Sequence, residues 1–220
     1  MDFSRYGALI LCTPNNPTGQ TVRPDLLEKL AGTGIRMLCD MCFLDLTAAP
    51  ERYDLPVLIE SFRNLVILKA FTKSFAIPGL RLGYALCSDP VFLLAMSQKA
   101  PCWNVSLPAQ AAGYAALSCG KWLKESAMAI SAERERMEKT LRDLGVKVYP
   151  GEANFLLLHS EADLYRLLLD RGILVRDCSD FVGLDKGYVR AAIRLPEENR
   201  CLLSAVEKIL EMSPSPGLSQ

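Results

Sequence analysis

A lysine, an aspartate and an arginine in the first half of the chain stand where apolar segments end. Asp40 closes the run at 36–40, Lys73 follows the run at 65–71, and Arg81 comes eight residues later, behind a Pro-Gly turn. An amine and a carboxylate can transfer protons, and a guanidinium binds anions through a planar fork of donors. These residue types would suit chemistry on a small molecule that carries an anionic group.

Each of these positions also has an ordinary structural interpretation. The Thr-Pro-Asn-Asn-Pro-Thr-Gly segment at 13–19 could be a polar turn, because Asn, Pro and Gly are turn residues. A carboxylate at the end of a buried strand needs solvent or a positively charged partner. Asp40 could instead be the N-cap of a helix. A single lysine at a strand end is more often a solvated charge. The residue types alone leave these alternatives open.

Short apolar runs alternate with helical patterns in this half, which predicts an α/β fold. We expect strands at 8–13, 36–40 and 65–71, and a helix that begins at Pro24 and ends before Gly32. Such strands are typical of a parallel sheet covered on both faces, with functional loops at the carboxyl ends of the strands. The candidate loops are therefore 14–19, 40–45 and 70–81.

The second half predicts a helical connector followed by a small α/β domain. Residues 107–144 have a helical pattern that Gly145 ends. Expected strands are 146–149, 155–160, 173–178 and 188–194; expected helices are 161–171 and a last one from Pro196. We therefore expect a first domain at 1–106, connecting helices at 107–145, a C-terminal domain at 146–212 and a disordered tail at 213–220.

Composition and charge exclude several classes of protein. Lysine plus arginine equals aspartate plus glutamate, 25 against 25, so no net field favours nucleic acid or an acidic membrane surface. Residues 1–7 lack the profile of a signal peptide, and no apolar run reaches the roughly 18 residues that span a bilayer. We expect a cytoplasmic protein that acts on a small molecule.

The eight cysteines predict neither a disulfide framework nor a metal site. They fall mostly in apolar runs, so we expect them to be reduced and mostly buried. Cys39 and Cys42 form a C-x-x-C, but no second such pair accompanies it, and His159 is the only histidine in the sequence. We expect no bound metal.

The three loops together resemble fold-type I pyridoxal-phosphate (PLP) enzymes, the aspartate aminotransferase group, over nearly the whole chain. The resemblance implies that fold: the 1–106 part would be the C-terminal part of the large PLP-binding domain, with a mainly parallel sheet. It also implies that Lys73 is the Schiff-base lysine and that Asp40 pairs with the pyridinium nitrogen. By the same resemblance, Asn16 donates to the ring oxygen and Arg81 binds the cofactor phosphate.

Two positions depart from the usual pattern of this group. A hydroxyl three residues before the lysine usually helps to bind phosphate; here that residue is Ala70, and Thr72 is the nearest hydroxyl that could compensate. The aminotransferase pattern Asp-x-Ala-Tyr is replaced at 40–43, where Phe43 stands in place of the tyrosine. We therefore expect Phe43 to line the cofactor without bonding it, and the site to differ from that of an ordinary aspartate aminotransferase.

Phe43 and the residues after it resemble threonine-phosphate decarboxylases of cobalamin biosynthesis, close to histidinol-phosphate aminotransferases. The Ile-x-Val-Arg-Asp-Cys-Ser segment at 173–179 is the most discriminating further likeness. The resemblance implies decarboxylation of L-threonine O-3-phosphate to (R)-1-amino-2-propanol O-2-phosphate. An aminotransferase is the alternative, because the sequence does not fix which bond of the substrate stands perpendicular to the PLP ring.

The resemblance also implies a substrate side to the site. Arg190 would bind the substrate α-carboxylate, and Asn154 and Arg176 would lie beside it. Arg190 could instead be an outward-facing strand residue that alternates with its apolar neighbours Val189 and Ala191. Arg176 could likewise have only a structural role.

Members of the group carry a further segment before the Asn-Asn-Pro-Thr-Gly loop and generally work as homodimers. This chain could therefore be a fragment, a truncated product or a non-catalytic relative kept for binding. A nucleotide-binding α/β domain is a weaker alternative, since neither G-x-G-x-x-G nor a Walker motif occurs in the sequence.

Overall fold

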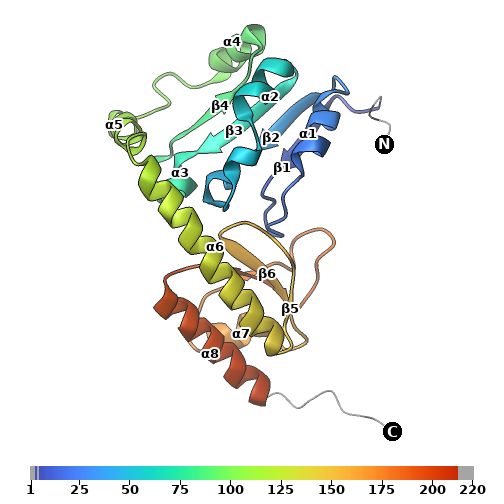
Figure 1. Cartoon of the computed structure of the whole chain (residues 1–220), viewed down its shortest axis with the longest axis vertical. Helices are drawn as coiled ribbons and strands as arrows, with labels where there is room; N and C mark the ends of the chain where they lie inside the picture. Colours follow the sequence, from blue (N-terminus) through green and yellow to red (C-terminus); the bar gives the residue numbers. More distant parts are fainter. Residues whose placement is uncertain (1–2, 4, 213–220) are drawn as a thin grey trace. The chain divides into compact units, whose positions relative to one another are not determined.

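The computed structural model describes residue 3 and residues 5–212. These residues form two compact units (Figure 1). The first comprises residues up to Asn15 together with Gln20–Met128, and the second comprises Asn16–Gly19 together with the chain from Ala129 onward. The division falls inside one helix, whereas the domain boundaries at 106 and 145 stay a prediction, as does the tail at 213–220, which lies outside the described residues.

The first unit is built on a mainly parallel sheet. Its strands β1 (Ala8–Cys12), β2 (Arg36–Asp40), β3 (Leu65–Ala70) and β4 (Gly83–Leu86) lie in the order β1-β2-β3-β4. The first three are parallel, as the sequence predicts, and β4 is antiparallel to β3. The sequence did not indicate β4, because a short strand that begins with a glycine has little local signal.

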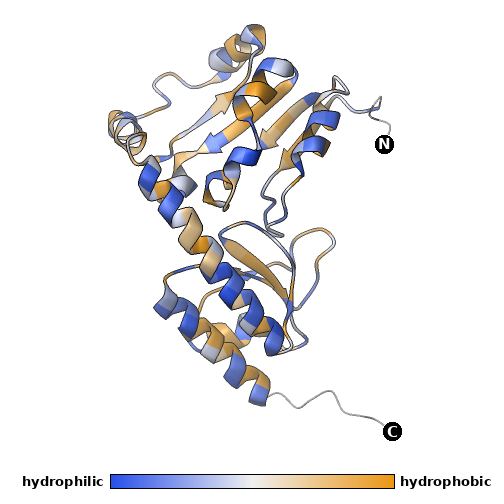
Figure 2. Ribbon diagram, viewed as in Figure 1, coloured by the Kyte–Doolittle hydropathy of each residue, from blue (hydrophilic) through white to orange (hydrophobic). Residues whose placement is uncertain are grey.

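One face of this sheet is packed by two helices, α1 (Pro24–Ala31) and α2 (Leu55–Ser61) (Figure 1). The core between them uses every second residue of β2 and β3, as the two-residue period of a strand requires. Its central buried members are Leu27, Met37, Cys39, Leu58, Leu65 and Ile67. Figure 2 shows that β2 and β3 are hydrophobic along most of their lengths, which is expected of strands buried on both sides.

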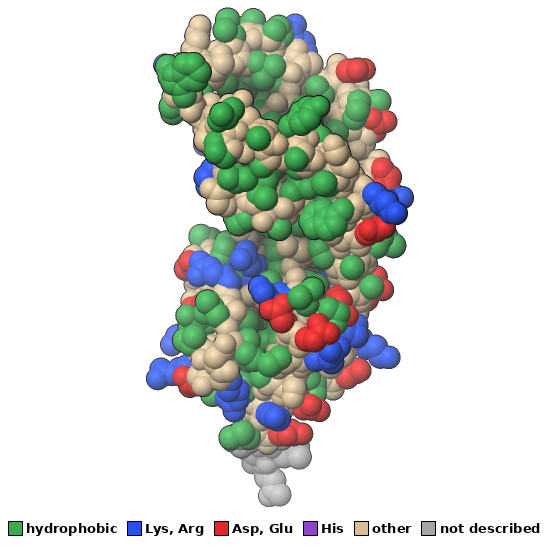
Figure 3. Space-filling model, turned by 90° about the vertical axis from the view of Figure 1, so that its left-hand side faces the viewer, with side chains coloured by type: hydrophobic (Ala, Val, Ile, Leu, Met, Phe, Trp, Pro, Cys, Tyr) green, Lys and Arg blue, Asp and Glu red, His purple; other side chains and the backbone are tan. Residues whose placement is uncertain are grey.

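The rest of the unit consists of α3 (Phe71–Ser74), α4 (Pro90–Lys99) and α5 (Leu107–Ala116). Hydrophobic side chains gather on the face that carries α4 and α5 (Figure 3). They are exposed in this chain, and the largest exposed fractions belong to Val91, Leu94, Trp103, Leu107, Tyr114 and Leu117. Exposed apolar groups of this extent are typical of contact surfaces.

The helical pattern predicted at 107–144 corresponds to two helices, α5 and α6 (Gly120–Asp143). The amide groups of Ser118 and Cys119 bond to carbonyl oxygens three residues earlier, at 3.1 and 2.9 Å. These tighter bonds end α5 before Gly120, the residue type with the lowest helix propensity after proline.

The second unit is a small α/β structure with an antiparallel sheet. Strands β5 (Lys147–Val148), β6 (Phe155–His159), β7 (Arg176–Asp177) and β8 (Tyr188–Ala192) lie in the order β5-β6-β8-β7. Helices α7 (Leu164–Leu169) and α8 (Pro196–Met212), with the C-terminal half of α6, supply the rest of its core. The core includes Met137, Leu141, Leu156, Leu158, Leu164, Val189 and Val206.

Strand β7 is shorter than the predicted strand at 173–178. The amide of Ile173 donates to Leu168 O at 2.9 Å and the amide of Gly172 to Leu169 O at 2.9 Å, so this backbone completes the end of α7. Gly172 has a φ of +75°, the left-handed conformation that commonly closes a helix. The first residues of the predicted strand are therefore used as a helix cap.

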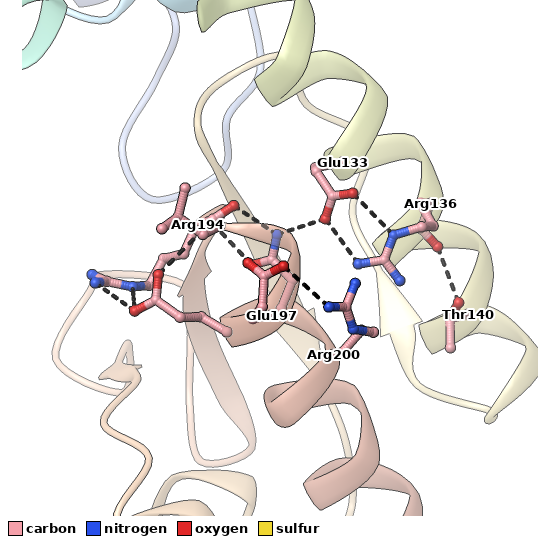
Figure 4. A network of polar contacts seen from close by, with 9 residues as sticks. Glu133, Arg136, Thr140, Arg194, Glu197 and Arg200 are labelled. Atoms are coloured by element: carbon pink, nitrogen blue, oxygen red, sulfur yellow. Dashed lines mark hydrogen bonds and ion pairs between the residues drawn. The ribbon is translucent and has the colours of Figure 1, made fainter.

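Polar contacts in the second unit link Glu133 and Arg136 of α6 with the segment around Arg194 (Figure 4). Asn199 of α8 bonds to both parts. Its side chain is buried; it donates to Glu133 Oε2 and to Arg194 O, both at 2.8 Å, and accepts from Arg194 N at 2.9 Å. The hydrogen bond from Arg136, followed by that from Asn199, lowers the pKa of Glu133. Because the folded-state pKa is lowered, this contribution to stability is present near neutral pH and is lost as acid protonates Glu133.

We expect Asn199→Leu to lower the free energy of unfolding by about 2–4 kcal/mol, because it leaves both backbone groups of Arg194 without these partners. Urea unfolding followed by circular dichroism measures the effect. Both tryptophans, Trp103 and Trp122, lie in the first unit, so their fluorescence reports that unit separately. Arg200→Ala, which removes an exposed ion pair, should change stability by only about 0.5 kcal/mol. Equal midpoints for the two variants would contradict the prediction.

Among residue 3 and residues 5–212, no helix combines the length and apolar character that crossing a membrane requires.

Candidate active site

The carboxyl ends of β1, β2 and β3 meet at one edge of the first unit's sheet. Cys12, Asp40 and Leu68 stand in register across the three strands. The loops that follow are tied to their neighbours, because Thr13 N donates to Asp40 O and Met41 N donates to Leu68 O, both at 2.9 Å. The parallel register therefore brings the predicted loops of this unit to the same edge.

Asp40 is half-buried at the end of β2. Its Oδ1 accepts the amide of Cys42 at 2.9 Å, which turns the chain sharply behind the strand. Burial raises the pKa of Cys42 to about 12, and a hydrogen bond from its thiol to Asp40 acts in the same direction. Burial, with smaller effects of Cys12 and Asp40, raises the pKa of Cys39 to about 12 as well.

The expectation that the cysteines are mostly buried was wrong. Cys39 and Cys178 are buried, whereas Cys102, Cys119 and Cys201 are exposed, and all eight are free thiols. The exposed cysteines lie on loops or on the outer face of α8, where an apolar sequence neighbour does not imply burial. Among the described residues, no group of metal-ligating side chains could hold an ion.

We predict that iodoacetamide at pH 8 labels the three exposed cysteines first and Cys39 and Cys42 last. A thiol with a pKa of about 12 is roughly one ten-thousandth thiolate at that pH, and the thiolate is the reactive form. Mass spectrometry of the labelled peptides measures the order. Asp40→Asn should speed labelling of Cys42, because it removes the carboxylate that disfavours the thiolate; early labelling of Cys42 in the unaltered chain would count against this account.

Lys73 lies on α3, directly after β3. Its side chain is exposed, and its Nζ stands 5.3 Å from the centroid of the Phe43 ring. An ammonium over an aromatic face is held by the quadrupole of the ring. Thr72 is half-buried beside it, and Ala70, the last residue of β3, carries no hydroxyl. The structure thus brings Lys73 to Phe43, which precedes the 3-10 helix η1 (Leu44–Leu46).

Arg81 follows the 3-10 helix η3 (Pro78–Leu80) and returns the chain toward α3. Its backbone is left-handed, with φ at 53°, and its Nη1 donates to Pro78 O at 3.1 Å. The next residue, Leu82, accepts the amide of Phe71 at 3.1 Å. The residue directly after Arg81 is thereby anchored to the first residue of the helix that carries Lys73.

The loop residues Asn16–Gly19 belong by their contacts to the second unit. Gly19 O accepts the amide of Glu152 at 2.7 Å, and Gly19 has a φ of +73°. A Cβ added at Gly151 would lie 2.9 Å from the Gly19 backbone, so both glycines are required for this close approach. This packing fixes the loop that begins with Asn16.

Arg190 of β8 donates from Nη1 to Asn16 Oδ1, and its guanidinium carbon lies 4.9 Å from the centroid of the Phe155 ring. Burial lowers the pKa of Arg190, and the positive charge of Arg176 acts in the same direction. Asn154 precedes Phe155; its Oδ1 is buried and accepts no hydrogen bond from the part of the chain that the structure describes. The second unit therefore brings Asn16 and Arg190 together.

Arg176 of β7 stands directly opposite Arg190 in the antiparallel register. Opposite residues of such a pair project from the same face of the sheet. Arg176 is exposed; it pairs with Asp180 and lies 5.7 Å from the ring centroid of Phe181. The register therefore places the two arginines on one face of the sheet.

The predicted site residues thus form two groups, one in each unit. The first unit carries Asp40, Phe43, Thr72, Lys73 and Arg81; the second carries Asn16, Asn154, Arg176 and Arg190. Sequence reasoning missed the polar contacts that Asp45 makes with Lys69 and with Ser74, although an acidic residue five positions after Asp40 was a visible signal.

The family of the chain follows from comparison with known proteins. A family model described as aminotransferase class I and II matches residues 3–206. The chain belongs to this family. The fold of the chain was predicted correctly. A histidinol-phosphate aminotransferase from Clostridium acetobutylicum superposes on it with a TM-score of 0.87 at 30% identity, over 93% of this chain and 64% of that one.

Two further proteins resemble the chain, one in sequence and one in fold. The threonine-phosphate decarboxylase of Salmonella typhimurium is 37% identical over 210 residues, which are 92% of this chain and 57% of that protein. A histidinol-phosphate aminotransferase from Sinorhizobium meliloti, solved in complex with pyridoxal-5'-phosphate, shares the fold at a TM-score of 0.81 and 24% identity, over 93% of this chain and 57% of that one. The chain thus spans less than two thirds of these relatives.

PLP is the cofactor of this family, and the residues of the first unit fit it. An amine, a carboxylate, a guanidinium and a hydroxyl stand near one edge of the sheet: Lys73 and Thr72 on α3, Asp40 at the end of β2, and Arg81 between η3 and β4. These are the groups that a Schiff base, a protonated pyridine nitrogen and a phosphate require. Phe43 offers an aromatic face beside the amine.

Proposed function

We propose that this chain is part of a PLP-dependent lyase that converts L-threonine O-3-phosphate to (R)-1-amino-2-propanol O-2-phosphate and CO2. The observation that carries the proposal is the pair Arg190 and Arg176, directly opposite each other on β8 and β7. Two arginines on one face of the sheet suit a substrate with two anionic groups, here a carboxylate and a phosphate. The identity with the Salmonella decarboxylase supports the same substrate.

In this proposal the residues of the first unit hold the cofactor. Lys73 bonds to it covalently, Asp40 keeps its pyridine nitrogen protonated, and Arg81 with Thr72 binds its phosphate. When bound, PLP supplies an electron sink for the pair of electrons that the departing carboxyl carbon leaves behind. Once the substrate amine has replaced the lysine on the cofactor, the freed Lys73 amine would deliver a proton to the carbon that has lost CO2, which completes the exchange of CO2 for one proton.

The residues of the second unit hold the substrate. Arg190 binds the α-carboxylate, and Arg176 binds the phosphate. Asn16 would offer its amide hydrogens to the cofactor's ring oxygen, because its own oxygen already accepts from Arg190. Asn154 offers a buried oxygen without a hydrogen-bond partner in the structure, which suits it to accept a proton donor of the substrate.

An aminotransferase of the histidinol-phosphate type is the second candidate, favoured by the structural likeness to the Clostridium enzyme. Histidinol phosphate carries one anionic group, but an acceptor such as 2-oxoglutarate carries two and would also use both arginines. Phe43 weighs toward the decarboxylase, because an aminotransferase of this group usually has a tyrosine there. In either case we propose that the whole enzyme is a cytoplasmic homodimer, and the decarboxylase would serve cobalamin biosynthesis.

Two measurements test the proposal. PLP is first titrated into the chain, and a visible absorption band that survives gel filtration is expected; its absence would favour a non-catalytic fragment. The loaded protein is then supplied with phosphothreonine, with and without 2-oxoglutarate. Release of CO2 and an amino alcohol phosphate without 2-oxoglutarate is expected, whereas a keto product that appears only with 2-oxoglutarate would establish the aminotransferase instead.

A further inference from the structure

A polar cluster of two buried residues and one half-buried carboxylate joins three elements of the first unit beside Lys73. Lys69 of β3 is 5% exposed and forms an ion pair with Asp45 Oδ1 of η1. Asp45 Oδ2 accepts the hydroxyl of Ser74, the last residue of α3, at 2.9 Å. Ser74 is 3% exposed. Each oxygen of one carboxylate therefore bonds to a different element, and Ser74 is the residue directly after Lys73.

The location of this cluster makes its bonds stronger than those of a surface ion pair. A buried ammonium is costly unless it is paired, so Lys69 fixes the position of the Asp45 carboxylate. A hydrogen bond from a hydroxyl to an ionised carboxylate is in turn stronger than one between neutral groups. Ser74 is thereby held to a carboxylate that is itself held in place.

Helix α3 needs such an external anchor. It has only four residues, and a single turn of helix is unstable without tertiary contacts. It touches the segment around η1 at two points, through Ser74 to Asp45 and through Lys73 to the Phe43 ring. Phe43 lies three residues after Asp40, so this segment also connects α3 to the candidate cofactor residue Asp40.

We propose that Asp45, fixed by Lys69, is a positioning residue that acts through Ser74 to hold the Lys73 amine in the geometry for bonding the cofactor. The inference rests on the proposed function, because it assigns Lys73 to the cofactor. The bond between Ser74 and Asp45 keeps the short helix α3 from rotating about its axis. Such a rotation would carry the Lys73 amine away from Phe43 and the sheet edge. Positioning of this kind changes the rate of bond formation more than the stability of the fold.

Ser74→Ala is the test variant, because it removes the hydroxyl and leaves the Lys69–Asp45 pair intact. We expect PLP to bond to Lys73 about tenfold more slowly, the loss that one hydrogen bond to a charged group would cause. The midpoint of thermal unfolding should stay close to that of the unaltered chain. Ser97→Ala, whose hydroxyl bonds only within exposed helix α4, is the matched control and should change neither quantity. Ser74→Thr keeps the hydroxyl and should restore most of the rate.

A readout without cofactor separates this inference from the proposed function. Hydrogen exchange of the Phe75 amide, which bonds to Phe71 O at 3.0 Å, should be about tenfold faster in Ser74→Ala, while the amides of β2 stay unchanged. Unchanged exchange, or an unchanged bonding rate in a chain that does bond PLP, would overturn the inference. A fall in thermal midpoint that accounts for the slower rate would do the same. If the unaltered chain forms no band, the proposed function fails, and the exchange comparison alone then decides whether Asp45 anchors α3.

Discussion

Lys73→Arg will abolish the visible absorption band that forms when PLP is added to the chain. Arginine keeps the positive charge and can still stack on the Phe43 ring, which lies 5.3 Å from the lysine amine. A guanidinium is not deprotonated in proteins, so it offers no free amine for a Schiff base. We expect complete loss of the covalent bond with little change in the thermal midpoint. Absorbance titration measures the first, and thermal denaturation measures the second.

Lys99→Arg is the matched control for this variant, because Lys99 is an exposed lysine at the end of α4 in the same unit. It should bond PLP as well as the unaltered chain does. Reduction of the loaded protein with borohydride, followed by peptide mass spectrometry, identifies the modified lysine directly. Label on Lys69 or Lys99 with an unaltered band in Lys73→Arg would remove Lys73 from the proposed site.

Arg190→Gln should weaken binding of phosphothreonine by about a hundredfold, since truncating one member of a close charge pair costs 2–5 kcal/mol or more. Binding of the product, (R)-1-amino-2-propanol O-2-phosphate, should change little, because that molecule has no carboxylate. Asn16 also loses the partner of its Oδ1, so we expect a small loss of affinity that is the same for both molecules. Calorimetric titration of the PLP-loaded chain with each molecule measures the difference.

Two neighbouring arginines make this test selective. Arg194→Gln removes an exposed arginine just after β8 that pairs with Glu198, and it should leave both affinities unchanged. Arg176→Gln should weaken the binding of both molecules alike, because both carry the phosphate that Arg176 is proposed to bind. If Arg190→Gln weakened the binding of the two molecules equally, Arg190 would not be the carboxylate ligand.

Much of the first unit could be predicted because its signals are local. An apolar run of five or six residues that ends in a charge indicates a buried strand with a functional loop, and Asp40 and Lys73 stand at such points. The helix from Pro24 was correct for a similar reason, because its start and end have residue-type signals. Strand β4 and the break before Gly120 had no such signal, since the first depends on pairing with β3 and the second on three-residue backbone bonds.

By itself the sequence determined which chemical groups the chain carries and the order of its loops: an amine at Lys73, a carboxylate at Asp40, and arginines at 81, 176 and 190. Only the tertiary structure decided which of these groups meet. Asn16 bonds to Arg190, a residue 174 positions away, and Lys69 bonds to Asp45 across two elements. Such contacts depend on register and on the burial of charge, which are properties of packed strands and helices and leave no local pattern. Lys73 was visible in the sequence; the cluster that holds its helix was not.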